Sequence, residues 1–172
     1  MTQYIFITNG TGGCGKDTFA NFVGEFVSTK KISSVDYVKK VAKDCGWDGR
    51  KKTEQDRKFL CDLKFLMSKY NDMPFRKVKE QVLSFWAQTR YQVLFIDIRE
   101  PMEIERAKRL FNAQTILIES NRVNRIITNE ADANVYNYNY DFIIENNGTL
   151  DELREKAYRF VKDNIVTNFL LI

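Results

Sequence analysis

The chain has 172 residues, of which 44% are hydrophobic and 29% are charged. This balance predicts a globular chain with a sizeable buried core. Its 27 Lys and Arg exceed its 23 Asp and Glu by only four, which gives little electrostatic footprint for duplex DNA. No apolar run approaches the ~20 residues that cross a membrane. Three cysteines at unrelated spacings, Cys14, Cys45 and Cys61, argue against a disulfide framework or a zinc site, so we expect a chain of the reducing cytoplasm. The sequence holds no histidine, which excludes Ser-His-Asp triads and histidine-ligated metals.

Strands and helices are predicted to alternate. Short apolar runs rich in β-forming residues predict buried strands at 4–8, 32–35, 93–97, 115–118 and 142–144. Apolar residues at helical spacing predict helices at 16–29, 36–45, 54–70, 74–89 and 102–111, and Thr149 with Glu152 predicts a capping box for a last helix to about 164. The alternation predicts the α/β class, with a parallel five-stranded sheet covered by helices on both faces.

A glycine-rich segment joins the first strand to the first helix. Its spacing, Gly10-x-x-x-x-Gly15-Lys16, is the P-loop pattern in its required context. The N–H groups of such a loop, the start of the helix and the lysine hold nucleotide phosphates. We therefore expect a three-layer P-loop NTPase fold that uses ATP with Mg²⁺. The expected ATP-binding residues are Gly10, Gly12, Gly13, Cys14, Gly15, Lys16, Asp17 and Thr18.

Two carboxylates are candidate magnesium ligands. The residue after the P-loop lysine is usually Ser or Thr, whose hydroxyl ligates Mg²⁺, but here it is Asp17, followed by Thr18. Asp17 could hold the metal directly or through water, and it could also cap the helix. Asp97 ends a buried strand at the edge where α/β sheets bind ligands. It is a candidate second metal ligand, or a general base, with a strand-end cap as the structural alternative.

The combination Gly15-Lys16-Asp17 resembles the phage-type deoxynucleoside monophosphate kinases and the phosphomevalonate kinases of animal type. Both belong to the nucleoside monophosphate kinase branch of P-loop proteins. Three further segments resemble that branch, in the same order along the chain, at 34–39, 97–103 and 141–150. The resemblance implies one kinase domain over 1–172, with a helical acceptor-binding insert at about 36–89 and a short lid at about 120–139.

The same resemblance implies roles for several basic residues. Lys16 would act on the transferring phosphate, and Arg122 and Arg125 would close on it from the lid. The residues implied for the acceptor phosphate are Lys39, Arg57 and Arg99. The structural alternative for each is an exposed charge on a helix or loop, or, for Arg99, an ion pair with a nearby glutamate.

Two residues after the last strand are candidates for the adenine side of the site. The backbone of Asn147 and Gly148 is expected to contact the base, unless the two only form a turn before the capped helix. The tyrosines at 136, 138 and 140 could stack on a base or serve as packing residues.

These features predict an ATP-dependent small-molecule kinase. It would transfer the γ-phosphoryl group to a phosphate-bearing acceptor, most simply a nucleoside or deoxynucleoside monophosphate, with dephosphocoenzyme A as a neighbouring variant. One alternative is a P-loop nucleotide-binding protein or slow NTPase switch without kinase activity. Another is a nucleic-acid-binding module that uses the basic run 50–52. Expected partners are ATP and the acceptor, with no membrane or nucleic acid, and the chain is expected to be a monomer or homodimer.

Overall fold

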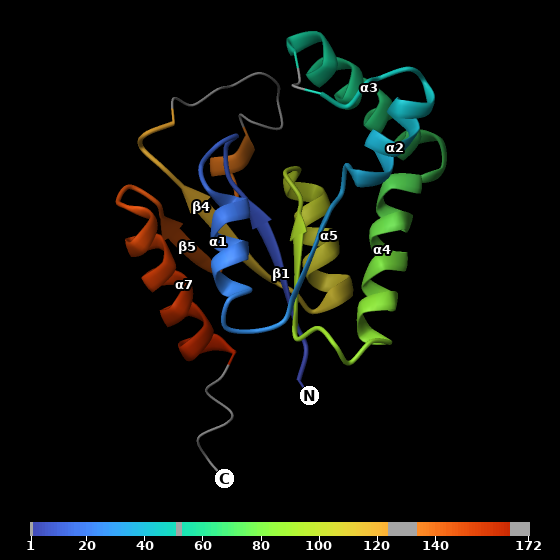
Figure 1. Ribbon diagram of the computed structural model, residues 1–172. Helices are drawn as coiled ribbons and strands as arrows, with labels where there is room; N and C mark the ends of the chain where they lie inside the picture. The colour runs from blue at the N-terminus through green and yellow to red at the C-terminus, as the bar shows by residue number, and fades with distance from the viewer. Residues whose placement is uncertain (1, 51–52, 124–133, 166–172) are drawn as a thin grey trace. The chain divides into compact units, whose positions relative to one another are not determined.

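The computed structural model describes residues 2–50, 53–123 and 134–165 (Figure 1). Within this part the chain forms two compact units. The second unit covers Ile32–Ala87, and the first contains the described residues on either side of it. The first unit carries the P-loop, and the second carries the three helices predicted between 36 and 89.

Five described strands form one parallel sheet, which confirms the predicted α/β class. They are β1 (Tyr4–Asn9), β2 (Thr29–Ser33), β3 (Val93–Asp97), β4 (Gln114–Glu119) and β5 (Phe142–Glu145). Their order across the sheet is β2-β3-β1-β4-β5. The carboxyl ends of β1 and β3 meet in register, with Thr8 opposite Asp97. The end of the first strand, from which the P-loop departs, therefore lies beside the strand end that carries Asp97.

Helices of the first unit cover both faces of the sheet (Figure 1). These helices are α1 (Lys16–Val23), α5 (Pro101–Phe111) and α7 (Leu150–Asn164), and a short 3-10 turn, η1, covers Asn134–Tyr136. Helices α1 and α7 lie side by side on one face, and α5 packs on β1 and β4 from the other. The predicted capping box of α7 is confirmed, because Thr149 and Glu152 each bond the other's backbone N–H.

The core between α1, α7 and the sheet is rich in aromatic side chains. The ring of Phe160 lies 5.0 Å from that of Phe6 and 5.6 Å from that of Phe19, both edge to face, a geometry favoured by aromatic quadrupoles. On β1, Phe6 faces this core while Ile5 and Ile7 alternate toward the other face, and all three are buried. A strand buried on both sides has no polar alternation, which is why its sequence is an unbroken apolar run.

The second unit is a small helical cluster. It contains α2 (Asp36–Asp44), α3 (Glu54–Asn71) and α4 (Met73–Trp86). Val38, Ala42 and Leu60 form its buried centre. Thr53 and Asp56 form a capping box at the start of α3, which fixes where that helix begins. The use of these helices as an acceptor-binding insert stays a prediction.

Two predicted boundaries in the first quarter of the chain are wrong. Helix α1 ends at Val23, with Gly24 as its C-cap, instead of continuing to 29. The apolar spacing continues past the end of the helix, because Val27 is buried in the core and Phe26 packs on Tyr158 from the turn after α1. Strand β2 consequently covers Thr29–Ser33, where a strand at 32–35 was predicted. Two consecutive lysines, Lys30 and Lys31, concealed the strand in the sequence.

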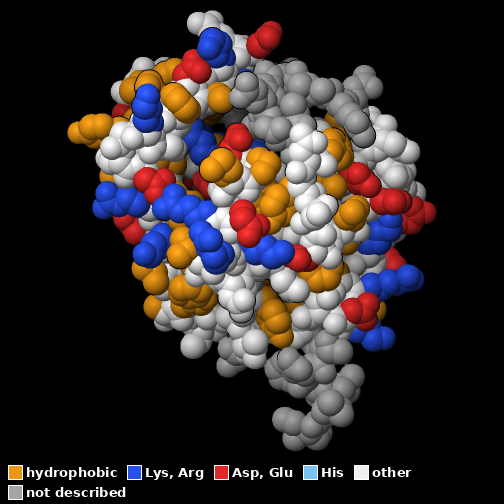
Figure 2. All heavy atoms as spheres, turned by 180° about the vertical axis from the view of Figure 1, so that it is seen from behind, with side chains coloured by type: hydrophobic (Ala, Val, Ile, Leu, Met, Phe, Trp, Pro, Cys, Tyr) orange, Lys and Arg blue, Asp and Glu red, His pale blue; other side chains and the backbone are white. Residues whose placement is uncertain are grey.

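No helix in the described residues is long and apolar enough to cross a membrane. The surface facing the viewer in Figure 2 mixes basic, acidic and hydrophobic side chains. Charges of both signs are therefore interspersed on that face.

Asp141 locks the amino-terminal ends of β4 and β5 together. Its carboxylate accepts hydrogen bonds from the N–H (2.8 Å) and hydroxyl (2.9 Å) of Thr115, and from Lys108 Nζ (2.8 Å). Partial burial alone would raise the pKa of Asp141, but the bonds from Lys108 and Thr115 outweigh it and hold the pKa below its ordinary value of 3.8. A carboxyl with a lowered folded-state pKa stabilises the fold above pH 3.8 and loses that contribution as the pH falls through the folded pKa.

Asp141→Ala is therefore expected to lower the free energy of unfolding at pH 7 by about 1–3 kcal/mol, because it leaves the Thr115 N–H without its acceptor. Urea unfolding of wild type and variant at pH 7 and at pH 2 measures the effect, which should shrink at pH 2. Asp62→Ala, which removes an exposed i,i+4 ion pair with Lys58, is the control and should cost less than about 0.5 kcal/mol. An equal cost of Asp141→Ala at both pH values would contradict the role of the charged carboxylate.

Candidate nucleotide site

Three glycines of the loop from β1 to α1, Gly10, Gly13 and Gly15, have a positive φ, and Gly10 and Gly15 are closely packed as well. Gly10 has φ +145° and Gly15 has φ +100°, values that side-chain-bearing residues rarely adopt. A Cβ on Gly10 would also meet the Ile118 carbonyl oxygen and, at 2.7 Å, the sulfur of Cys14. A Cβ on Gly15 would meet the amide of Asn146. Local strain and close packing therefore both select glycine at these two positions.

Asn146 holds the loop from outside. Its side-chain N–H donates to the Cys14 carbonyl oxygen (2.9 Å), and its backbone N–H donates to the Glu119 carbonyl oxygen (2.7 Å). Only 8% of Asn146 is exposed, so both bonds are shielded from water. Sequence reasoning missed this residue, which it assigned only to a turn. The available signal was an amide directly after the last strand, at the sheet edge where the P-loop lies.

Asn9 organises the start of the loop. Its Oδ1 accepts a hydrogen bond from the Gly10 N–H (2.8 Å), and its Nδ2 donates to the Tyr140 hydroxyl (2.8 Å) and the Arg99 carbonyl oxygen (3.3 Å). The Tyr140 hydroxyl in turn donates to the Val135 carbonyl oxygen (2.7 Å). Burial raises the pKa of Tyr140 from its ordinary value of 10.0 to about 12. Tyr140 is thus a structural anchor of the loop.

Lys16 folds back over the loop that precedes it. Its Nζ donates to the carbonyl oxygens of Gly10 (2.7 Å) and Thr11 (3.1 Å). Burial lowers the pKa of Lys16 below its ordinary value of 10.5. Cys14 opposes this shift, whereas the positive charge of Arg99 adds to it. A partly buried ammonium with cationic neighbours is stabilised by an anion, and phosphate oxygens supply one.

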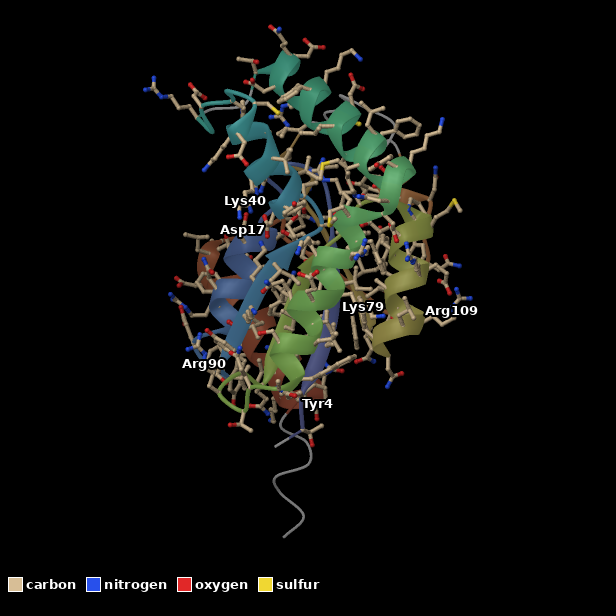
Figure 3. The ribbon with its side chains drawn as sticks, turned by 90° about the vertical axis from the view of Figure 1, so that its right-hand side faces the viewer. Tyr4, Asp17, Lys40, Lys79, Arg90 and Arg109 are labelled. Carbon is tan, nitrogen blue, oxygen red and sulfur yellow. The ribbon has the colours of Figure 1, made fainter. Side chains whose placement is uncertain are left out.

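The two candidate metal ligands converge on a single cation. Asp17 lies in the first turn of α1 (Figure 3), and Asp97 ends β3. Both carboxylates contact the ammonium of Lys31, Asp97 at 3.1 Å. Asp97 also accepts a hydrogen bond from the Thr8 hydroxyl. The expected alternative role of Asp17 as a helix cap is wrong, because Gly15 is the N-cap and no side-chain cap bond is formed there.

The donor set fits Mg²⁺, which binds through one or two carboxylates together with substrate phosphates. Within the described residues no group of three or more Cys, Asp or Glu side chains is placed to hold a metal. Asp17 and Asp97 reach one point in space, and Thr18 follows Asp17 in α1. Phosphate oxygens and water would have to complete the coordination.

Four arginines were predicted for the site, namely Arg57, Arg99, Arg122 and Arg125. Arg122 donates to the backbone oxygen (3.0 Å) and Oδ1 (3.1 Å) of Asn146, so it contacts the residue that holds the P-loop. Arg99 is partly buried just after β3, close enough to influence the pKa of Lys16. Arg125 lies outside the described residues, as do residues 124–133 of the predicted lid.

A hollow of about 430 Å³ opens at the carboxyl ends of β4 and β5. Asn147, predicted to contact the base, lines it and accepts a hydrogen bond from the Asn121 N–H (2.8 Å). Gly148 is not among the lining residues and lies against Glu152 of the capping box. The remaining lining residues are Glu119, Ser120, Asn121, Val123, Tyr136 and Glu145. Val123 comes within 3.9 Å of a Cβ built on Gly13, so this hollow borders the P-loop.

Lys39 and Arg57 both lie in the second unit, on α2 and α3. Lys39 forms an ion pair with Asp36 (3.4 Å), and Arg57 is exposed on α3. Neither lines the hollow of about 400 Å³ in this unit. The residues that line it are Ile32, Ser33, Asp36, Tyr37, Lys40, Pro74, Lys77, Val78, Glu80 and Gln81. Within this hollow Lys77 stacks on the Tyr37 ring, 5.5 Å from its centroid.

No family model matches the chain, and no curated protein sequence matches it. Among solved structures, the chain is similar to an unliganded sugar kinase from Janibacter sp. HTCC2649, with a TM-score of 0.59 and 10% identity over 95% of this chain and 96% of that one. It is also similar to the protein APE1195, with a TM-score of 0.52 and 14% identity over 95% and 97% of the two chains. At these identities the likeness shows the fold, which is the fold of P-loop kinases.

The geometry of the loop predicts a sharp difference between two of its glycines. Gly10→Ala is expected to lower the free energy of unfolding by about 1–3 kcal/mol, because it forces a strained φ and a clash with backbone. Gly12→Ala is the matched control, because its φ is not positive and no atom lies within 4 Å of a Cβ there. It should change stability by less than about 0.5 kcal/mol. Chemical denaturation without nucleotide measures both, and equal effects would refute this loop conformation.

Proposed function

We propose that the chain is an ATP-dependent small-molecule kinase whose acceptor carries a phosphate, most simply a nucleoside or deoxynucleoside monophosphate. The observation that carries this proposal is the P-loop. Three glycines with positive φ and the hydrogen bond from the Asn146 side chain to the Cys14 carbonyl oxygen fix its backbone, and the partly buried ammonium of Lys16 lies over it. The P-loop kinase fold supports the reaction class, and the resemblance of three further segments supports the choice of acceptor.

Phosphoryl transfer depends on positioning and charge neutralisation more than on a covalent catalyst. The loop N–H groups and Lys16 would hold the donor phosphates, next to the hollow that Asn147 lines. Arg122 would leave the Asn146 oxygens for the transferring phosphoryl group, with Arg125 as its proposed companion. Arg99 would bind the acceptor phosphate from the end of β3.

Magnesium is the proposed cofactor, held by Asp17, Thr18 and Asp97. When bound, it neutralises charge that develops on the phosphate oxygens. Thr8 supports this role, because its hydroxyl donates to Asp97 and fixes the orientation of that carboxylate. Lys39 and Arg57, on the second unit, remain proposed acceptor ligands whose role rests on the family resemblance alone.

ADP release from Mg-ATP tests the proposal against a panel of nucleoside and deoxynucleoside monophosphates, with dephosphocoenzyme A and phosphomevalonate included. One acceptor is expected to stimulate ADP release strongly. Lys16→Ala should reduce that rate roughly 100-fold or more, because it removes a charge aimed at the phosphates.

Arg109→Ala is the matched control, since Arg109 is an exposed cation in the last turn of α5 (Figure 3), and it should leave the rate unchanged. ATP binding without stimulation by any acceptor would instead favour the nucleotide-binding or slow NTPase alternative. A normal rate in the Lys16→Ala variant would reject the P-loop as the donor site.

A further inference from the structure

Lys31 occupies a position that the sequence did not identify. It lies on β2, and 28% of its side chain is exposed. Its single ammonium nitrogen contacts an oxygen of Asp17 and an oxygen of Asp97, the latter at 3.1 Å. Lys31 is therefore part of the charge arrangement around the P-loop.

The aspartate at position 17 creates a need for such a cation. Where a P-loop carries Ser or Thr after its lysine, the group there is neutral. In this chain the residue after the P-loop lysine is Asp17, whose carboxylate contacts the same ammonium as that of Asp97. Two like charges at short range repel each other unless a positive charge lies between them. Lys31 supplies that charge, and the Thr8 hydroxyl fixes Asp97 from its other oxygen.

We propose that Lys31 is a positioning residue that holds Asp17 and Asp97 together and competes with a divalent cation for their oxygens. The proposal rests on the proposed function only in taking these carboxylates as the metal ligands. It follows from the contacts, because the ammonium bonds the same oxygens that a metal would use. It also gives Asp17 and Lys31 a joint role, in which the unusual P-loop acid depends on the β2 lysine.

The test uses the full chain without nucleotide and Mn²⁺ as the probe, with free Mn²⁺ counted by electron paramagnetic resonance. Lys31→Met removes the competitor, so Mn²⁺ is expected to bind roughly tenfold tighter than in wild type. Lys31→Arg keeps a cation there and should stay close to wild type. Asp17→Asn combined with Lys31→Met should cancel the gain, because one of the two ligands is then lost.

Lys30→Met is the matched control, because it removes the same charge from the neighbouring residue of the same strand. Successive side chains of a strand point to opposite faces of the sheet. Lys30→Met should leave Mn²⁺ binding unchanged. Thermal unfolding checks that each variant is folded. If the Lys31→Met variant is not folded, Lys31→Gln replaces it in the test. The glutamine amide is uncharged and can still donate to a carboxylate, so this variant should also bind Mn²⁺ more tightly than wild type.

Unchanged or weaker Mn²⁺ binding in a folded Lys31→Met or Lys31→Gln variant would overturn the proposal, as would equal tightening in the Lys30→Met control. These outcomes are separate from the kinase assay. Tighter Mn²⁺ binding in a chain that transfers no phosphate would leave this inference standing and reject the proposed function. Phosphate transfer by the chain, without tighter Mn²⁺ binding in the Lys31→Met variant, would support the proposed function and reject this inference.

Discussion

The hydrogen bond from the Asn146 side chain to the Cys14 carbonyl oxygen fixes the conformation on which the candidate site depends. It joins the end of β5 to a loop 132 positions earlier in the chain. The same residue receives Arg122 on two oxygens and approaches the backbone of Gly15 closely enough to require glycine there. One buried amide thus couples the phosphate loop, the last strand and a candidate catalytic arginine. An amide suits this place because it donates and accepts at once without adding a charge.

Three cations around the loop each lie against oxygen atoms of the chain. Lys16 sits over backbone carbonyl oxygens, Lys31 lies between two aspartates, and Arg122 rests on the oxygens of Asn146. Each cation bonds oxygens that are weaker or more dispersed partners than a triphosphate. This arrangement gives nucleotide binding a physical rationale, because a polyanion would replace those weaker partners with stronger ones. It also explains how a chain without histidine is suited to phosphate chemistry, which relies on positioned charge.

Features that depend on neighbouring residues were predicted well. The apolar run of β1 and the glycine spacing of the loop are local signals, as is the Thr149–Glu152 capping box, and the structure bears out the strand and the box. Asn9 and Asn146 were missed because strand order sets their partners, which lie 90 to 132 positions away in the chain. Lys31 was missed because two consecutive lysines concealed the strand that carries it. The end of α1 was misplaced because Val27 continues the apolar spacing after the helix has stopped at Gly24.

The proposed function requires that the β1–α1 loop bind the phosphates of a nucleotide. Amide chemical shifts of ¹⁵N-labelled protein, followed during titration with ATP and Mg²⁺, measure this binding residue by residue. We expect the largest shifts at Gly13, Gly15 and Lys16, with smaller ones at the Asn146 side chain, and their loss in the Lys16→Ala variant. Shifts confined to other parts of the chain, or none at saturating ATP, would show that the loop does not bind the phosphates.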